Sequence, residues 1–348
     1  MTQTRILAGD IGGTKTTLAI FAAGATAGAA AGATVDRAAL PRAPEREATY
    51  ASAEHGGLLP IVQDFLAGES APLAAACFGI AGPVVANRSV TPNLPWVVDG
   101  GDIARTTGIA RVELVNDLVA MGLGIAALAA QDFVTLQEGV ATPVGTAGNA
   151  ALLAAGTGLG ITVMAAEPGG FRPLPSEGGH QDLAPRTDEE LALLRYLRPL
   201  YGRVSAERAI SGPGLHNIYK YLRDSGFAPE TPEIRARLAV EDPGAVIGEA
   251  AIAGACALST HAVEMFAGLY GAVAGNTALL GLATQGVFLG GGIAPKLLPR
   301  LQDGRFLAAF FDKGRMRPLL ETFPVKVILE PKTPLLGAAR RAAELAAG

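Results

Sequence analysis

The chain has few of the residues that build disulfide frameworks or metal centres. Its 348 residues include two cysteines and four histidines. Cys77 and Cys256 each lie inside an apolar run, a context that fits a buried reduced thiol better than a disulfide or a metal ligand. Structural zinc needs about four Cys or His ligands at close spacing. Because the four histidines are scattered, we expect no zinc.

The sequence also lacks an excess of charge of either sign. Lysine and arginine together number 28 and aspartate and glutamate 32, a formal net charge of −4. Nucleic acids and anionic membrane surfaces attract strongly basic proteins or basic patches. The composition therefore gives no reason to expect a nucleic acid or a membrane as a partner.

A long apolar run of the kind that spans a membrane is missing as well. Residues 148–166 are nearly all apolar, but they include four glycines and divide into two runs with strand character. We interpret them as a buried β-hairpin. The first four residues lead straight into an apolar run, which leaves no room for a signal peptide. We therefore expect a cytoplasmic protein.

Neither of two common nucleotide-binding fingerprints occurs. The glycine-rich segment Gly156–Gly160 is not closed by the Gly-Lys-Ser or Gly-Lys-Thr of a P-loop. It also lacks the third-glycine spacing and the following helix of a dinucleotide-binding fold. Nucleotide chemistry in this chain needs a different arrangement.

Two glycine-rich turns, each between short apolar runs, suggest such an arrangement. The runs are residues 5–8 and 17–21 around GDIGGT at 9–14, and residues 151–155 and 161–165 around GTGLG at 156–160. Glycine lets the backbone approach a bulky anion, so that N–H groups can face phosphate oxygens. Asp10, at a strand end, could hold a hydrated magnesium ion against those oxygens. The two turns predict two halves that face each other across a triphosphate. For the first turn, a plain tight hairpin is the alternative.

Strand and helix patterns alternate along the rest of the chain. Further strands are predicted at 73–80, 111–115, 286–289 and 325–329. Helices are predicted at 54–67, 118–123, 188–200, 205–210, 214–224, 244–280, 294–301 and 334–346. This alternation is typical of an α/β protein whose ligands gather at the carboxyl ends of the strands. Residues 22–35, which are low in complexity, are predicted to form a turn and a weak strand.

The length of the chain allows two domains. With 348 residues, of which 49% are hydrophobic, it can form two cores with one interdomain cleft. We expect a smaller domain of residues 1–120 plus 334–348 and a larger domain of residues 121–333. Hinge closure of such domains would exclude water from the cleft.

Asn116 and Asp117 follow one of the predicted strands. A carboxylate at a strand end beside a cleft can accept a proton from a substrate hydroxyl. Phosphoryl transfer needs one such carboxylate to orient the attacking oxygen. An aspartate before an apolar helix is also a strong N-cap. The local sequence leaves both roles open for Asp117.

The segment 175–185 is too polar and too rich in glycine for a core strand, so it must lie on the surface or line a cleft. Glu177 and His180 flank two glycines, so both side chains can converge on one polyol. A polar loop with a structural histidine is the alternative. Further on, Glu207 lies in the first turn of a short helix capped by Ser205, where a dipole-stabilised surface carboxylate is equally compatible.

Seven motifs together make the chain resemble the zinc-free group of bacterial ATP-dependent glucokinases, in the superfamily of hexokinase, actin and the heat-shock chaperone ATPases. They are GDIGGT at 9–14, GIAGPV at 79–84, LVNDLVA at 114–120, AAGTGLG at 154–160, EGGHQDLAP at 177–185, VSAERAISGPGL at 204–215 and GGGIAPK at 290–296. Their order and spacing match from the first strand to the final helix. The glycine turns occur throughout the superfamily, whereas EGGH with the AER and SGPG stretch is more specific to this group.

The resemblance implies a two-domain ribonuclease H-like or actin-like ATPase fold with an interdomain cleft. It also implies a homodimer that phosphorylates the 6-hydroxyl of glucose with ATP and Mg²⁺, giving glucose 6-phosphate and ADP. The implied sugar ligands are Asn116, Asp117, Glu177, His180 and Glu207, with Asp117 as the base. The implied phosphate and magnesium site comprises Asp10, Gly12, Gly13, Thr14, Gly156, Thr157 and Gly158. The implied adenosine contacts are Gly290, Gly291 and Gly292.

Lys15 departs from the pattern of this group, which often has Asn after Gly-Gly-Thr. Gly-Gly-Thr-Lys is more typical of the repressor–ORF–kinase sugar kinases. Those relatives usually carry a cysteine-rich zinc motif after the EGGH-type histidine, and residues 181–185 contain no cysteine. Lys15 fits a point charge near the phosphates and a solvated side chain equally well.

Alternatives to a glucose kinase that uses ATP stay open. They are a kinase for fructose, mannose or an N-acetyl-hexosamine, and a glucokinase that uses ADP or polyphosphate. The same fold also supports sugar-sensing proteins without catalysis. A repressor of that kind would need a helix-turn-helix segment, usually ahead of the first strand, and only four residues precede Arg5.

Overall fold

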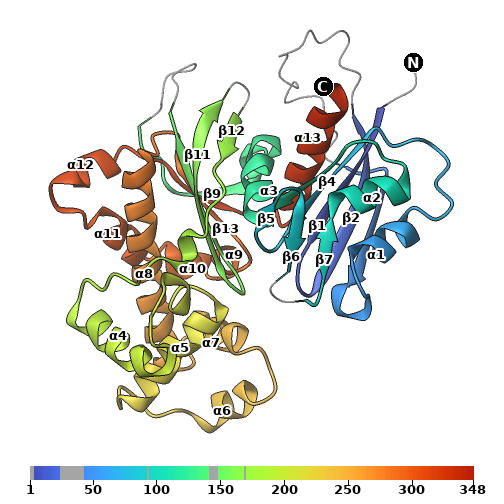
Figure 1. Ribbon diagram of the computed structural model, residues 1–348. Coiled ribbons are helices and arrows are strands. Elements are labelled where there is room, and N and C mark those ends of the chain that lie inside the picture. Colours follow the sequence, from blue (N-terminus) through green and yellow to red (C-terminus); the bar gives the residue numbers. More distant parts are fainter. Residues whose placement is uncertain (1–3, 24–42, 92–93, 141–147, 168–169) are drawn as a thin grey trace. The chain divides into compact units, whose positions relative to one another are not determined.

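The computed structural model describes residues 4–23, 43–91, 94–140, 148–167 and 170–348. Backbone contacts divide the chain into two compact units (Figure 1). Unit 1 comprises Met1–Ala130, Ala166–Pro175 and Glu330–Gly348, and unit 2 comprises Gln131–Ala165 and Ser176–Leu329. Most of the segment 22–35, predicted as a turn and a weak strand, lies outside the described residues.

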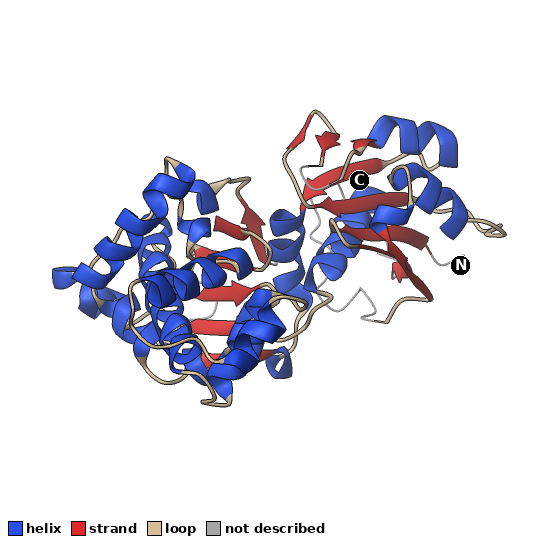
Figure 2. Ribbon diagram, turned by 90° about the horizontal axis from the view of Figure 1, so that it is seen from below, coloured by secondary structure: helices blue, strands red, loops and turns tan. Residues whose placement is uncertain are grey.

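Unit 1 is built on a five-stranded sheet with the order β3-β2-β1-β4-β8. The strands are drawn in red in Figure 2. Its strands are β1 (Thr4–Ile11), β2 (Lys15–Ala23), β3 (Arg46–Ala51), β4 (Ala75–Ile80) and β8 (Val112–Asn116). β2 runs antiparallel to both β1 and β3, whereas β1, β4 and β8 run parallel. The carboxyl ends of three parallel strands therefore meet at one sheet edge.

Both faces of this sheet are covered. Successive strand residues point to opposite faces, and in β1 Leu7 belongs to one buried cluster while Ile6 and Ala8 belong to another. The first cluster includes side chains from α1 and α2, and the second includes side chains from α3 and α13. The bounds are α1 (Leu58–Phe65), α2 (Gly100–Thr107), α3 (Asp117–Gly124) and α13 (Thr333–Ala347). A small sheet of β5 (Val84–Val85), β6 (Arg88–Val90) and β7 (Val97–Asp99) precedes α2.

α3 and α13 approach so closely that each needs a glycine. A Cβ on Gly337 would overlap the carbonyl oxygen of Ala120, and a Cβ on Gly124 would overlap the carbonyl oxygen of Thr333. A backbone carbonyl cannot move aside as a flexible side chain can. These glycines therefore allow the C-terminal helix to pack directly on the helix that begins with Asp117.

The second sheet has the order β12-β11-β10-β13-β14-β9. Its strands are β9 (Phe133–Gln137), β10 (Ala150–Ala155), β11 (Leu159–Glu167), β12 (Gly170–Pro173), β13 (Val287–Gly290) and β14 (Val325–Ile328). β10 and β11 form an antiparallel hairpin, and β13 runs parallel to both β10 and β14. Apart from β9, this is the strand order of the first sheet. The predictions of an α/β fold and of a hairpin at 148–166 are confirmed.

Helices surround a long central helix in unit 2. They are α4 (Asp188–Tyr201), α5 (Gly212–Asp224), α6 (Pro232–Leu238), α7 (Pro243–Ile252), α8 (Ala257–Gly281), α9 (Ile293–Lys296), α10 (Leu298–Leu301), α11 (Arg305–Phe311) and α12 (Arg317–Leu320). α8 packs against α11, α7 and α5 and against β10. Most of its residues are buried, as expected for a helix that is apolar on all sides.

The helical stretch predicted over 244–280 consists of two helices. α7 ends at Ile252, α8 begins at Ala257, and the two are bent by 100°. Gly254, with a φ of 64°, turns the chain between them in a conformation that residues with a Cβ rarely adopt. The predicted helix 294–301 likewise divides into α9 and α10, and within 205–210 only the 3₁₀ turn Ala206–Arg208 forms.

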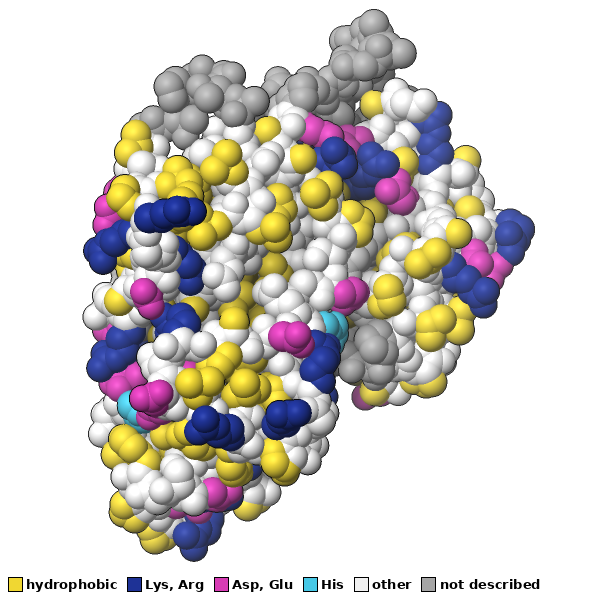
Figure 3. Space-filling model, turned by 60° about the vertical axis from the view of Figure 1, so that its left-hand side comes forward, with side chains coloured by type: hydrophobic (Ala, Val, Ile, Leu, Met, Phe, Trp, Pro, Cys, Tyr) yellow, Lys and Arg dark blue, Asp and Glu magenta, His cyan; other side chains and the backbone are white. Residues whose placement is uncertain are grey.

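Among the described residues, no single helix is both long and apolar enough to cross a membrane, although the bent pair α7 and α8 would qualify by length and composition. On the face drawn in Figure 3, basic and acidic side chains alternate among apolar ones. The described part of that face carries no continuous stripe of one charge.

Replacing Gly337 tests the close contact between α3 and α13. We expect Gly337→Ala to lower the free energy of unfolding by about 1–3 kcal/mol, the usual cost of forcing extra atoms into a packed contact. Urea unfolding of the full chain measures this change. Gly56→Ala is the control, because a Cβ at Gly56 meets no atom within 4 Å. Wild-type stability in Gly337→Ala would contradict the close contact.

Candidate active site

In unit 1 the predicted site residues gather at the carboxyl edge of the parallel strands. Asp10 is the penultimate residue of β1, Asn116 ends β8, and Asp117 begins α3. β4 lies between the two strands, with Gly79 opposite Asp10 and Ile80 opposite Asn116. The sheet therefore brings together residues that are far apart in the sequence.

The carboxyl groups of Asp10 and Asp117 influence each other. The pKa of Asp10 is raised to about 6, first because burial disfavours the charged form and second because the negative charge of Asp117 opposes another charge. A cation relieves both effects. Magnesium usually takes one or two protein carboxylates and completes its shell with water and substrate phosphates. The pair therefore fits the predicted ion.

Asn116, not Asp117, is the N-cap of α3. Its Oδ1 accepts a hydrogen bond from the N–H of Leu118 at 2.9 Å, and its Nδ2 donates to the carbonyl oxygen of Gly82 at 3.0 Å. Oδ1 of Asp117 accepts from the same Leu118 N–H at 2.8 Å. The N-cap alternative for Asp117 is therefore wrong, and the start of the helix orients its carboxylate.

The first glycine turn joins β1 to β2 through three residues, Gly12–Thr14. The N–H of Gly12 donates to the carbonyl oxygen of Lys15 at 2.9 Å. Thr14 and Lys15 are exposed at the tip. A small hollow beside the turn is lined by Ile11, Gly12, Gly13, Ala81, Thr91 and Leu94. The turn is therefore accessible from its tip and borders the GIAGPV motif at Ala81.

In unit 2 two glycine-rich turns leave the same sheet edge. β10 and β13 are parallel, with Ala154 opposite Gly290, so the turns that follow these strands are neighbours. Gly291 has a φ of 80°, and a Cβ there would overlap the carbonyl oxygen of Ala155. Both the conformation and the contact require glycine at this position.

Glu177, His180 and Glu207 are held around the start of β11. A Cβ on Gly179, inside the EGGH motif, would overlap the carbonyl oxygen of Leu159. Oε2 of Glu207 accepts a hydrogen bond from the N–H of the same Leu159 at 3.0 Å. Glu177 and His180 are exposed, and Glu207 is half-buried. A predicted sugar carboxylate is thus anchored next to the turn predicted to hold phosphates.

Arg203, which the sequence did not single out, fixes the EGGH segment. One of its guanidinium nitrogens donates to the carbonyl oxygen of His180 at 2.8 Å and to Oδ1 of Asp182 at 2.6 Å. The N–H of Ala206 donates to the carbonyl oxygen of Gln181 at 2.8 Å. The only sequence signal for these contacts was the polarity of the region. Hydrogen bonds between two loop segments, here 180–182 and 203–206, leave no periodic pattern in the sequence.

The glucokinase family model matches residues 7–345. The chain belongs to the glucokinase family. It is 42% identical to the glucokinase of Nostoc punctiforme, over 99% of this chain and 100% of the relative. The crystal structure of a glucokinase from an Antarctic psychrotroph has a TM-score of 0.80 at 28% identity and covers 99% of this chain and 100% of its own. A ROK family glucokinase from Streptomyces griseus shares the fold, with a TM-score of 0.64, 20% identity, and coverage of 98% and 99%.

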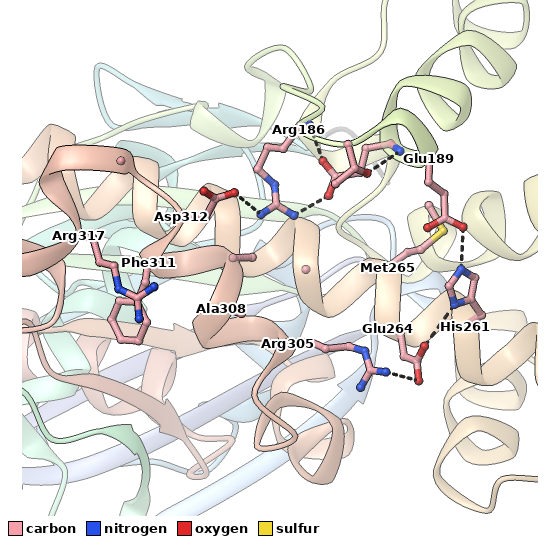
Figure 4. A pocket seen from close by; sticks show the side chains of 15 residues that line it. Arg186, Glu189, His261, Glu264, Met265, Arg305, Ala308, Phe311, Asp312 and Arg317 are labelled. Atoms are coloured by element: carbon pink, nitrogen blue, oxygen red, sulfur yellow. Dashed lines mark hydrogen bonds and ion pairs between the residues drawn. The ribbon is translucent and has the colours of Figure 1, made fainter.

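None of the predicted site residues of this glucokinase-family chain lines a cavity of about 750 Å³ in unit 2 (Figure 4). Side chains from α4, α8 and α11 form much of its wall. Arg186 pairs with Glu190 and Asp312, Arg305 pairs with Glu264 and Asp303, and Arg317 pairs with Glu321. The two ring nitrogens of His261 are hydrogen-bonded to Glu189 and Glu264. Because Arg186, Arg305 and Arg317 are already paired with carboxylates, the cavity is a poor phosphate site.

The raised pKa of Asp10 predicts that this residue costs stability at neutral pH. The folded protein binds the Asp10 proton more tightly than the unfolded chain, so stability falls as pH rises from about 4 to about 6. We expect Asp10→Asn to raise the free energy of unfolding by roughly 1–3 kcal/mol at pH 8.

The stability gained by Asp10→Asn should shrink toward zero below pH 4, where the Asp10 carboxyl group of the wild type is largely protonated in both the folded and the unfolded state. Urea unfolding at the two pH values measures it, with the exposed Asp188 changed to Asn as the control. An equal gain at both pH values would contradict the burial of a charge.

Proposed function

We propose that the chain is a glucokinase that transfers the γ-phosphoryl group of ATP to the 6-hydroxyl of glucose, giving glucose 6-phosphate and ADP. The observation that carries this proposal is that carboxylate side chains lie beside both glycine turns. The Asp10–Asp117 pair lies beside one turn, and Glu207 is bonded to the other. Membership of the glucokinase family and the S. griseus structure, which holds glucose and AMPPNP, support both substrates.

Asp117 is the proposed base for the sugar 6-hydroxyl. Phosphoryl transfer needs mainly positioning and neutralisation of charge, with one carboxylate to accept the proton of the attacking hydroxyl. The bond from Leu118 N–H to Oδ1 of Asp117 holds the carboxylate in a defined orientation at the sheet edge.

The glycine turns are the proposed site of the ATP phosphates. Asp10, Gly12, Gly13 and Thr14 in unit 1 and Gly156, Thr157 and Gly158 in unit 2 would hold the phosphates and magnesium. The ion supplies positive charge that offsets the charge developing on the transferred group. Because Gly290, Gly291 and Gly292 have no side chains, the adenosine could lie close to the backbone at the end of β13.

The proposed sugar ligands are Asn116, Asp117, Glu177, His180 and Glu207. A neutral sugar is recognised by donors and acceptors placed opposite its hydroxyls. The Asn116 amide uses one lone pair for Leu118 and one N–H for Gly82. A primary amide carries two of each, so one acceptor position and one donor of Asn116 remain for the sugar.

Four further statements are part of the proposal. The segments 1–120 plus 334–348 and 121–333 would act as the two domains of a closing cleft. The protein would be cytoplasmic. It would form a homodimer, and light scattering can test this oligomeric state. It would need no zinc, so removal of zinc with a selective chelator should leave its activity unchanged.

A coupled ADP-release assay tests the proposed reaction. Glucose, fructose, mannose and N-acetylglucosamine are compared as acceptors with ATP as donor, and glucose 6-phosphate formation is then measured with ADP or polyphosphate as donor. The proposal requires the highest kcat/KM for glucose with ATP. A higher value for another hexose or donor would support one of the related kinases. Sugar binding without phosphorylation by any donor would identify a non-catalytic sugar-binding protein.

Asp117→Asn tests the base. Asparagine keeps the shape and an acceptor oxygen but cannot take the proton, so we expect kcat to fall by roughly 10²–10⁴-fold. The dissociation constant for glucose should change much less. Because Asn116 is the N-cap and the substitution removes a charge that opposes Asp10, Asp117→Asn should be at least as stable as the wild type, which urea unfolding checks. A variant that retains more than about a tenth of the wild-type kcat would refute the role.

Glutamate substitutions separate the sugar site from the nucleotide site. Glu177→Gln should weaken glucose binding by roughly 1.5–3 kcal/mol, as for a lost charged hydrogen bond, with little change in KM for ATP. Glu207→Gln should behave alike, because its amide oxygen can still accept from Leu159 N–H. Glu207→Ala removes that bond and should raise KM for ATP as well. Equal effects on both substrates in Glu177→Gln would exclude Glu177 as a sugar ligand.

A further inference from the structure

Ser52 lies behind the first glycine turn and holds it at two points. Its Oγ donates to the carbonyl oxygen of Gly12 at 2.8 Å, and its backbone N–H donates to the carbonyl oxygen of Thr14 at 3.0 Å. Ser52 is fully buried and follows directly after β3. The sheet therefore fixes the position of Ser52. This residue donates hydrogen bonds to the carbonyl groups of Gly12 and Thr14, the two neighbours of Gly13.

Thr16 extends this contact into a chain of hydroxyl groups. Its Oγ1 lies 3.0 Å from Oγ of Ser52, and Thr16 is also fully buried. A serine hydroxyl has one hydrogen, and Ser52 donates it to Gly12. Thr16 must therefore be the donor in the Thr16–Ser52 bond. The hydrogen bonds run in one direction, from Thr16 through Ser52 to the carbonyl oxygen of Gly12.

These bonds set the direction of N–H groups in the turn. In a trans peptide the carbonyl and the N–H of the same plane point in opposite directions. Because the Gly12 and Thr14 carbonyls point toward Ser52, the N–H groups of Gly13 and Lys15 point away from this buried residue. Without such contacts a glycine peptide adopts either orientation with little strain.

We propose that Ser52 and Thr16 are positioning residues that hold the turn Gly12–Thr14 in the orientation that binds phosphate. The inference rests on the proposed role of this turn in ATP binding. It adds a source of affinity that touches no substrate. A turn held in its binding orientation loses less conformational entropy when a ligand orders it, so loss of the hydroxyl chain should weaken nucleotide binding selectively.

The first test is the affinity of the full chain for AMPPNP with Mg²⁺, measured by calorimetry. We expect Ser52→Ala to raise the dissociation constant about 3- to 10-fold, the effect of one lost hydrogen bond. KM for ATP should rise to a similar extent. The dissociation constant for glucose should stay within about 2-fold of wild type, since none of the sugar ligands contacts the hydroxyl chain.

Two substitutions of Thr16 separate the hydroxyl from the packing. Thr16→Val keeps the shape but cannot donate to Ser52. The bond from Ser52 to Gly12 remains but loses its support, so AMPPNP binding should weaken by less than in Ser52→Ala. Thr16→Ser keeps the donor and loses a methyl group. It should lower the unfolding temperature while leaving AMPPNP affinity at the wild-type level.

Thr49→Ala and Ile61→Val are the controls. Thr49 pairs with Thr17 through hydroxyl oxygens 3.1 Å apart, between the same two strands, but its hydroxyl bonds no turn carbonyl. Ile61 lies in the buried cluster shared by β1 and α1, and its truncation lowers stability without touching the turn. Both controls should bind AMPPNP like wild type.

The positioning role is overturned if Ser52→Ala and Thr16→Val bind AMPPNP as tightly as Thr49→Ala, or if every variant loses affinity in proportion to its unfolding temperature. A wild-type chain that binds no AMPPNP overturns it too. A wild-type chain that binds AMPPNP but does not phosphorylate glucose refutes the proposed function alone, and the pattern of AMPPNP affinities then still decides the role of Ser52.

Discussion

Direct contact between backbone segments is the constraint on which the candidate site depends. The carbonyl of Leu159 touches Gly179, and its N–H bonds Glu207. One residue of β11 thus positions both the EGGH segment and the AER segment. The carbonyl of Ala155 meets Gly291 in the same way. Such contacts leave no space for a Cβ, and they keep the segments that follow the strands of the second sheet close together.

Both glycine turns are supported by hydrogen bonds from segments that follow later in the sequence. Ser52 bonds two carbonyls of the first turn. The carbonyl of Gly156 in the second accepts from the N–H of Gly212, at the start of α5, at 2.8 Å. In each case a distant element fixes the orientation of a carbonyl group in the turn. The repeat of the strand order in the two sheets therefore extends to the way their turns are supported.

The carboxylates at the edge of the first sheet show how function opposes stability. Burial and a neighbouring negative charge make the ionised form of Asp10 unfavourable. A structure selected for stability alone would replace such a pair with neutral side chains. Keeping it is understandable if a cation completes the group, because the ion then neutralises the charge that the protein alone leaves uncompensated.

The sequence by itself determined the hairpins, most of the buried strands, the EGGH segment and, through seven motifs, the family. These features are local: glycine, a carboxylate and an apolar period of two or 3.6 residues carry their signal within a few positions. Tertiary structure decided the rest. It brought Ser52 to the first glycine turn and Arg203 to the EGGH segment, each from a distant part of the chain. The physical reason is that hydrogen bonds between distant segments depend on how sheets and loops align, which no local pattern records.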